Sequence, residues 1–243
     1  MNCTHVVATS IQGCGTIGAF SFFNAIGRPY VWEASQFATS PEAAVVKILG
    51  DGGTLDDAWD TIVAHCESAS HLRGFTGWPY NLFWKQWDGY VHYQPKFIHW
   101  TRPAQDWAKV ELAFQLMRGV APEIEGYHII RQFIFGDTLT YDSTVADWQR
   151  WVDAYHKWNN DIKAYFAGKD NFLEIDPENE DSLELANRIC VFLGIENIAS
   201  THYPDRGAVG GERYGLLDET GWDDTFTGKW NEYKPLINWD ATV

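Results

Sequence analysis

Cysteine is scarce in this sequence, and its spacing matches no metal or redox motif. The four cysteines, Cys3, Cys14, Cys66 and Cys190, include no CxxC pair and have no histidine at metal-ligand spacing. We therefore expect reduced thiols and no bound metal. No apolar run approaches about 18 residues, and no charged start followed by an apolar stretch precedes the first predicted strand. These absences predict a cytoplasmic protein with neither a membrane span nor a secretory signal.

Positive charge is also in short supply. The sequence has 18 Lys and Arg against 33 Asp and Glu, a formal net charge of −15, and its basic residues are scattered. Such a surface repels the phosphate backbone of nucleic acid and anionic lipid, so we expect neither as a partner. Any anionic ligand must be held locally, by backbone amides and one or two selected cations.

Aromatic residues, by contrast, are abundant, at 16% of the 243 residues with 13 Trp. A chain so rich in aromatic residues and only 21% charged predicts a packed globule, and its length suits a single domain. We place the core at about 4–205 and a C-terminal extension at 206–243. Five tryptophans could stack on sugar or aromatic ligands, but we assign most of them to packing: Trp78, Trp84, Trp87, Trp100 and Trp107.

Predicted strands alternate with predicted helices along the chain, which favours parallel βαβ units. We therefore predict an α/β fold with three layers, α/β/α, around a central parallel sheet. The predicted strands are 4–9, 29–33, 72–76, 96–102 and 171–175, and the predicted helices are 18–27, 41–49, 55–66, 80–87, 104–118, 143–166 and 182–194. The segment 119–142 has no assignment and is interpreted as an insertion or lid.

A glycine turn, QGCGTIG over Gln12–Gly18, joins the first predicted strand to the first predicted helix. The unpaired backbone amides at the start of a helix, together with the helix dipole, form an anion site. The sequence lacks the lysine and the spacing of a Walker A loop. On these residues alone, an ordinary glycine-rich turn between strand and helix explains the pattern equally well.

Arg102 follows a later predicted strand, in the sequence Thr101-Arg102-Pro103. Ligands of open parallel sheets gather at the carboxyl ends of the strands, so Arg102 should point towards the edge that carries the glycine turn. A guanidinium can grip phosphate through two hydrogen bonds. The alternative is an arginine that is simply solvated at a strand end.

Taken in order, several segments resemble the sulfotransferases that use 3′-phosphoadenosine 5′-phosphosulfate, over about Val6–Asp205. They are GCGTIGAFSFFNAIG, GFTGWPYNLFW, KFIHWTRPAQDW, YHKWNNDIKAYF, NFLEID and LANRICVFLGI. The resemblance implies a fold like that of the P-loop nucleotide hydrolases and a site for this donor. The donor-site positions it implies are Gln12, Gly13, Cys14, Gly15, Thr16 and Ile17 in the turn, Arg102 and Val110 for the 3′-phosphate, and Arg206 in RGAVGGER.

The sequence departs from the family pattern at several of the compared positions. Gly13 stands where the family has Lys or Arg beside the phosphosulfate, so the cation that would neutralise the leaving oxygen is missing. Ile17 replaces the second turn threonine, and Gly77 replaces the Asp of Asp-Trp-Pro. Val110 replaces a serine that binds the 3′-phosphate, a role for which the adjacent Lys109 is a candidate.

Glu33 is the candidate general base, because VWEASQF is similar to the Lys-Glu-x-x-x-Phe neighbourhood of the polysaccharide sulfotransferases. The alternative for Glu33 is a capping or surface glutamate. His99, within a predicted strand, is interpreted as a core residue, whereas His71 and His128 lie in segments without a firm assignment. RGAVGGER could cover a nucleotide, or could be a surface loop.

These features predict sulfuryl transfer to a hydroxyl or amine of a small molecule or glycan. A second hypothesis is a binding protein on the same scaffold that has lost turnover, because fold does not fix function. A third, a P-loop kinase, lacks its phosphate lysine.

Overall fold

The computed structural model describes most of the chain, with gaps in the turn after the first strand and before the C-terminal segment. The described residues are 5–11, 14, 19, 22, 23, 25, 26, 31–33, 41–68, 74–90, 92, 94–117, 125–195 and 222–240.

A five-stranded sheet with the order β2-β3-β1-β4-β5 forms the centre of the molecule, and each neighbouring pair of strands is parallel. Its strands are β1 (Val6–Ala8), β2 (Val31–Glu33), β3 (Gly74–Thr76), β4 (Lys96–Trp100) and β5 (Phe172–Ile175). Strand β1 lies between β3 and β4, and its three residues are almost completely buried. Short apolar runs without alternation suit such a sheet, because a parallel sheet is covered on both faces. All five predicted strands are confirmed, with shorter bounds.

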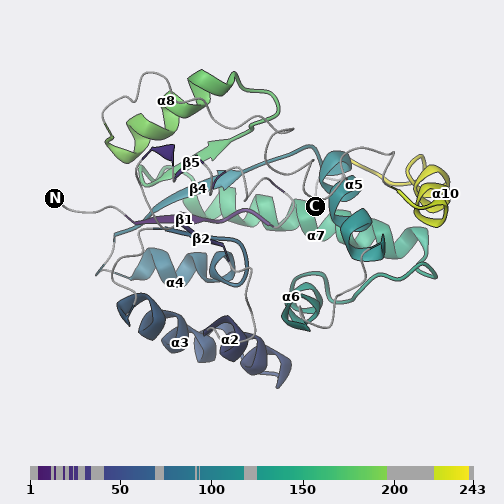
Figure 1. Ribbon diagram of the computed structural model, residues 1–243, viewed down its shortest axis with the longest axis horizontal. Helices are drawn as coiled ribbons and strands as arrows, with labels where there is room; N and C mark the ends of the chain where they lie inside the picture. The colour runs from purple at the N-terminus through teal and green to yellow at the C-terminus, as the bar shows by residue number, and fades with distance from the viewer. Residues whose placement is uncertain are drawn as a thin grey trace.

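Helices cover both faces of the sheet, which gives the predicted three layers (Figure 1). Helices α2 (Pro41–Gly50), α3 (Leu55–Ser68) and α4 (Trp84–Gly89) lie on one side, and α8 (Ser182–Leu193) lies on the other. The segment after Pro79 begins with a 3-10 helix, η1 (Tyr80–Phe83), before α4, where the sequence predicts one continuous helix.

Helices α5 (Ala104–Met117) and α7 (Val145–Phe166) follow the predicted bounds closely. A capping box starts α7, in which the Thr144 hydroxyl accepts from the Asp147 amide while the Asp147 carboxylate accepts from the Thr144 amide. Helix α8 ends at Gly194, which adopts a left-handed conformation with φ 67°. These helix ends were predictable because their signals are local.

The segment predicted as an insertion or lid contains a buried helix, α6 (Glu125–Phe135). Its Arg131 is only 1% exposed, and Nε and Nη2 each lie 2.9 Å from Oε1 of Glu111 on α5. Because α6 is held to α5 by a buried ion pair, it forms part of the packed core.

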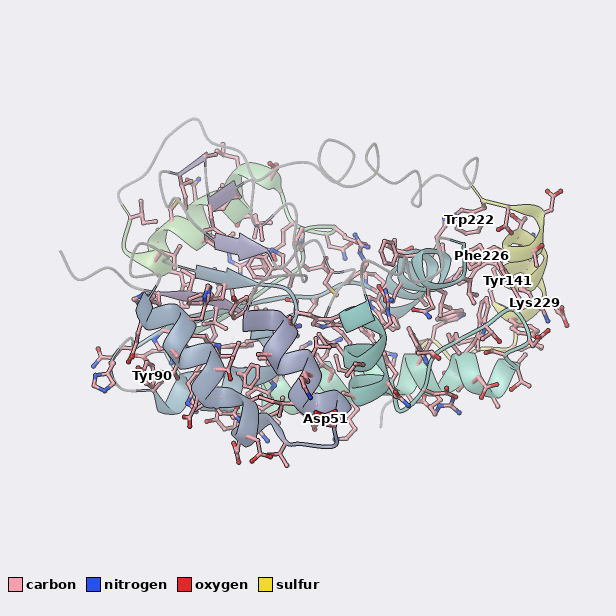
Figure 2. All side chains as sticks on the ribbon, turned by 60° about the horizontal axis from the view of Figure 1, so that its bottom comes forward. Asp51, Tyr90, Tyr141, Trp222, Phe226 and Lys229 are labelled. Carbon is pink, nitrogen blue, oxygen red and sulfur yellow. The ribbon has the colours of Figure 1, made fainter. Side chains whose placement is uncertain are left out.

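The C-terminal extension also contains a helix, α10 (Asp224–Tyr233), which the sequence did not predict. Trp222, Phe226 and Lys229 gather with Tyr141 at one end of the molecule (Figure 2). The Tyr141 hydroxyl donates to Asp223 over 2.7 Å, and the Phe226 and Trp222 rings meet edge to face at 4.7 Å. The Phe226 and Trp230 rings lie 6.2 and 6.3 Å from the ring of Trp148 on α7, so aromatic packing fixes this segment against α7.

The five tryptophans assigned mainly to packing are all buried, which confirms that interpretation. Trp78, Trp84, Trp87, Trp100 and Trp107 are each at most 7% exposed.

Candidate functional site

The segments that follow β1 and β4 start side by side at the carboxyl edge of the sheet. Strands β1 and β4 are paired in register, with Ala8 opposite Ile98, and the Thr9 amide donates to the Ile98 carbonyl over 3.1 Å. One residue further, the Trp100 amide donates to the Ser10 hydroxyl. The glycine turn and Arg102 therefore leave the sheet at the same edge.

Within the turn, the structure describes Cys14 alone. The other predicted donor positions there, Gln12, Gly13, Gly15, Thr16 and Ile17, lie outside the described residues. Beyond the turn, Ala19, Phe22 and Phe23 are helical and buried, and the Ile26 amide donates to the Phe22 carbonyl over 3.0 Å. The described residues thus agree with the predicted order of strand, turn and helix.

Cys14 is buried, and its Sγ lies 3.7 Å from the hydroxyl of Tyr155 on α7. Burial raises the pKa of Cys14 to about 11, and the positive charge of Arg102 opposes that rise in part. The thiol is therefore protonated at neutral pH.

Arg102 is mostly buried and paired with a carboxylate. Its Nε donates to Oε1 of Glu178, in the segment between β5 and α8, and the two side chains are 7% and 8% exposed. Its backbone carbonyl accepts a hydrogen bond from the Tyr155 hydroxyl over 2.7 Å. Tyr155 thus links the glycine turn to the start of α5, while its ring stacks on Trp107 at 4.3 Å and 11°.

The positions predicted to assist Arg102 differ in their surroundings. Val110 is half-buried in α5, and its apolar side chain offers no hydrogen bond to a phosphate. Lys109 places its ammonium 5.4 Å from the centre of the Trp222 ring, in a cation–π contact with the C-terminal segment. Arg206 lies outside the described residues.

Glu33 is the last residue of β2, which is at the end of the strand order and separated from β1 by β3. At about 4.8 Å between strands, its backbone lies roughly 10 Å from β1 along the carboxyl edge. The structure describes no side chain there. The role of Glu33 as a base therefore stays a prediction.

His99 is confirmed as a core residue. It is fully buried, with Nδ1 3.0 Å from the Thr9 hydroxyl. Burial lowers the pKa of His99 to about 3, with a further contribution from the charge of Lys163, so the imidazole is neutral at neutral pH. His71 and the side chain of His128 lie outside the described residues.

Beside Arg102, a cleft of about 360 Å³ opens between the start of α5, helix α7 and the C-terminal segment. This volume falls within the range of small-molecule sites. The lining residues are Thr101, Arg102, Pro103, Ala104, Gln105, Tyr155, His156, Asn159, Asn160, Lys163, Trp239 and Asp240.

Sequence reasoning did not single out Tyr155, Glu178, Asn159 or Trp239 as site residues. Tyr155 and Asn159 occupy adjacent turns of α7, within a segment that the sequence marks as an amphipathic helix. Their inward position follows from the spacing of apolar residues along α7, and this spacing is the sequence signal from which that position could have been predicted. The pairing of Glu178 with Arg102 has no local signal, because 76 residues separate the two.

Within the described part of the chain, no cluster of three or more His, Cys, Asp or Glu side chains could hold a metal ion. No described helix is long and apolar enough to cross a membrane.

The sequence matches no protein-family model and no curated protein. Among solved structures, the chain is similar to a mouse sulfotransferase, SULT7A1, in complex with PAP. The two are 14% identical, the match covers 97% of this chain and 83% of that one, and the TM-score is 0.44.

Proposed function

We propose that this chain is a sulfotransferase that moves a sulfuryl group from 3′-phosphoadenosine 5′-phosphosulfate to a hydroxyl or amine of a small molecule or glycan. One observation supports the proposal most directly: Arg102 and the turn residue Cys14 lie at the same edge of the sheet and are joined through Tyr155. Turn amides at one end and a guanidinium at the other suit a nucleotide that carries anionic groups on both its 5′ and 3′ positions.

In this proposal, the acceptor oxygen or nitrogen forms a bond to sulfur as the bond from sulfur to the 5′-phosphate oxygen breaks. Glu33 takes the proton from the acceptor, and the amides of the turn stabilise the charge on the departing phosphate. Gly13 supplies no cation there, so the amides carry this stabilisation without a lysine or arginine from that position. We therefore expect slow turnover.

The 3′-phosphate must share Arg102 with Glu178, because the guanidinium already donates to that carboxylate. Two anions beside one cation repel each other, and they do so strongly where both are shielded from water. Neutralising Glu178 should therefore strengthen donor binding, whereas removing Arg102 should weaken it.

Titration calorimetry with adenosine 3′,5′-bisphosphate tests the donor site. Glu178→Gln should bind more tightly than the wild type. Arg102→Met combined with Glu178→Gln, which leaves no unpaired buried carboxylate, should bind at least about 10-fold more weakly than Glu178→Gln, the loss typical of a charge-assisted hydrogen bond. Arg150→Met, at an arginine that is 44% exposed, is the matched control and should bind like the wild type.

Failure of the wild type to bind the bisphosphate would contradict the proposed enzyme. If Glu178→Gln and the double variant with Arg102→Met bind the bisphosphate equally well, Arg102 is not part of the donor site. Tighter binding of ATP than of the bisphosphate would favour a P-loop kinase instead.

A binding protein that has lost turnover is the second candidate function. The apolar Val110 and the carboxylate that holds Arg102 favour it, because both weaken the grip on a 3′-phosphate. Transfer of radiolabelled sulfate from the donor to a panel of phenols, amines and glycans separates the two candidates. Binding without transfer to any acceptor would establish the second.

A further inference from the structure

The hydrogen-bond ladder between β1 and β4 ends irregularly just before the glycine turn. In a regular parallel ladder, the bond that follows the one from the Thr9 amide to the Ile98 carbonyl would run from the Trp100 amide to the Thr9 carbonyl. The Trp100 amide donates to the Ser10 hydroxyl instead. The Thr9 carbonyl therefore needs a partner from outside the sheet.

Side chains of two other elements bind the backbone at this point. The indole N–H of Trp158, on α7, donates to the Thr9 carbonyl over 3.0 Å. The amide nitrogen Nδ2 of Asn81, in η1, donates to the Ser10 carbonyl over 2.7 Å. Thr9, Ser10 and Asn81 are completely buried, and Trp158 is half-buried. Because a buried carbonyl without a partner costs about 1–3 kcal/mol, this backbone conformation depends on both side chains.

The two hydrogen bonds fix how the chain enters the glycine turn. The peptide unit is planar, so holding the Ser10 carbonyl also fixes the direction of the Ile11 amide. Ile11, the residue before the turn, is itself completely buried. Loss of either bond would let the chain rotate immediately before Gln12, where the turn begins.

Helix α7 holds the turn at a second point as well. One turn of the helix before Trp158, the Tyr155 hydroxyl lies 3.7 Å from Cys14 Sγ within the glycine turn and donates to the Arg102 carbonyl. The same helix therefore contacts the entry to the turn, the turn itself and the backbone of Arg102. Groups that bind a ligand must be held to within about 0.5 Å of the productive geometry, and this is the task of the residues behind them.

We propose that Asn81 and Trp158 are positioning residues for the donor site, which act through the carbonyls of Ser10 and Thr9 and not by touching the donor. The inference rests on the proposed function, in which the amides of the turn bind the 5′ end of the donor. It predicts that loss of either side-chain donor impairs recognition of the 5′-phosphate and spares that of the 3′-phosphate.

Titration calorimetry with two nucleotides tests the proposal on the full chain. The probes are adenosine 3′,5′-bisphosphate and adenosine 3′-monophosphate, which lacks the 5′-phosphate. The wild type should bind the bisphosphate more tightly. Asn81→Ala and Trp158→Phe should each weaken binding of the bisphosphate by at least about 5-fold, the effect of one hydrogen bond to the phosphate, and leave the affinity for the 3′-monophosphate unchanged.

Asn171→Ala is the matched control. Asn171 also donates from Nδ2 to a backbone carbonyl, that of Pro95, but it lies just before β5, at the amino edge of the sheet. This variant should bind both nucleotides like the wild type. Circular dichroism confirms that each variant is folded. If Asn81→Ala does not fold, Trp158→Phe gives the result, because it keeps an aromatic ring at a half-buried position and removes only the indole donor.

An equal loss of affinity for the two nucleotides would indicate a general distortion and would overturn the positioning role. Wild-type affinity for the bisphosphate in the folded variants would overturn it too, and both results leave the proposed function standing. If the wild type binds neither nucleotide, the proposed function fails and the positioning role fails with it.

Discussion

The ion pair between Arg131 and Glu111 gives the sharpest test of how α6 is packed. The two side chains are 1% and 3% exposed, and Nη2 lies 2.9 Å from Oε1. Arg131→Met keeps much of the side-chain volume but leaves a buried carboxylate without its partner. Breaking a buried pair in this way costs about 3–5 kcal/mol of the free energy of unfolding.

Urea denaturation followed by circular dichroism measures that loss. At an m-value of about 3 kcal/mol/M, the midpoint should fall by about 1–2 M. Arg150→Met is the matched control, since Arg150 pairs at the surface with Asp137 and Asp147, and the three side chains are 44%, 54% and 29% exposed. An exposed pair contributes about 0–1 kcal/mol, so the control midpoint should move little.

The double variant Arg131→Met with Glu111→Leu removes both charges and should be more stable than Arg131→Met alone, because no unpaired charge remains. Losses in the single variants that simply add in the double variant would contradict a direct interaction. A midpoint for Arg131→Met equal to that of Arg150→Met would show that α6 is not anchored through this pair.

Three further predictions concern other parts of the molecule. Burial raises the pKa of Asp88, but hydrogen bonds from Lys169, Asn171 and Tyr165 outweigh it, so the pKa of Asp88 lies below its unfolded value of 3.8. Asp88 therefore stabilises the folded protein above pH 3.8, and this stabilisation is lost as the pH falls through the folded pKa. Asp88→Asn should lower Tm by about 2–4 °C at pH 7 for each kcal/mol lost, and calorimetric scans should show the difference from wild type shrinking below pH 3.8. Tyr155→Phe keeps the ring but removes the donor to the Arg102 carbonyl, so the free energy of unfolding in urea should fall by about 1 kcal/mol, and an unchanged value would contradict that hydrogen bond. With its pKa raised to about 11, Cys14 should react with iodoacetamide at pH 8 about 100-fold more slowly in the native than in the denatured protein, as measured by mass spectrometry, and equal rates would refute its burial.

Strand positions and most helix ends were predictable because their signals are local. Strand β1 comes from a run of β-branched residues, and α8 ends where Gly194 supplies the left-handed conformation. Such signals need no knowledge of what lies across the molecule.

Helices α6 and α10 escaped prediction because distant contacts stabilise them. Arg131 interrupts the apolar pattern of α6 and is buried only because Glu111, on another helix, neutralises it. Helix α10 contains Gly228 and is polar along much of its length, but Phe226 and Trp230 pack against Trp148 on α7. Tertiary packing here overrides weak helix propensity.

The candidate site likewise has a part that the sequence predicts and a part that depends on distant contacts. The parallel order of the strands alone requires that the turn after β1 and Arg102 after β4 meet at one edge. The partner of Arg102 could not be deduced, because DPENEDS offers several carboxylates and only the packing of the β5–α8 segment selects Glu178.

The pairing of Arg102 with Glu178 determines what kind of ligand this edge can hold. The carboxylate fixes the guanidinium in place, which lowers the entropy lost on binding, but it also cancels much of the positive charge that would attract an anion. A chain with a formal net charge of −15 supplies no long-range attraction to replace it. In the proposed function, affinity for the anionic donor must therefore come from short-range hydrogen bonds rather than from long-range attraction.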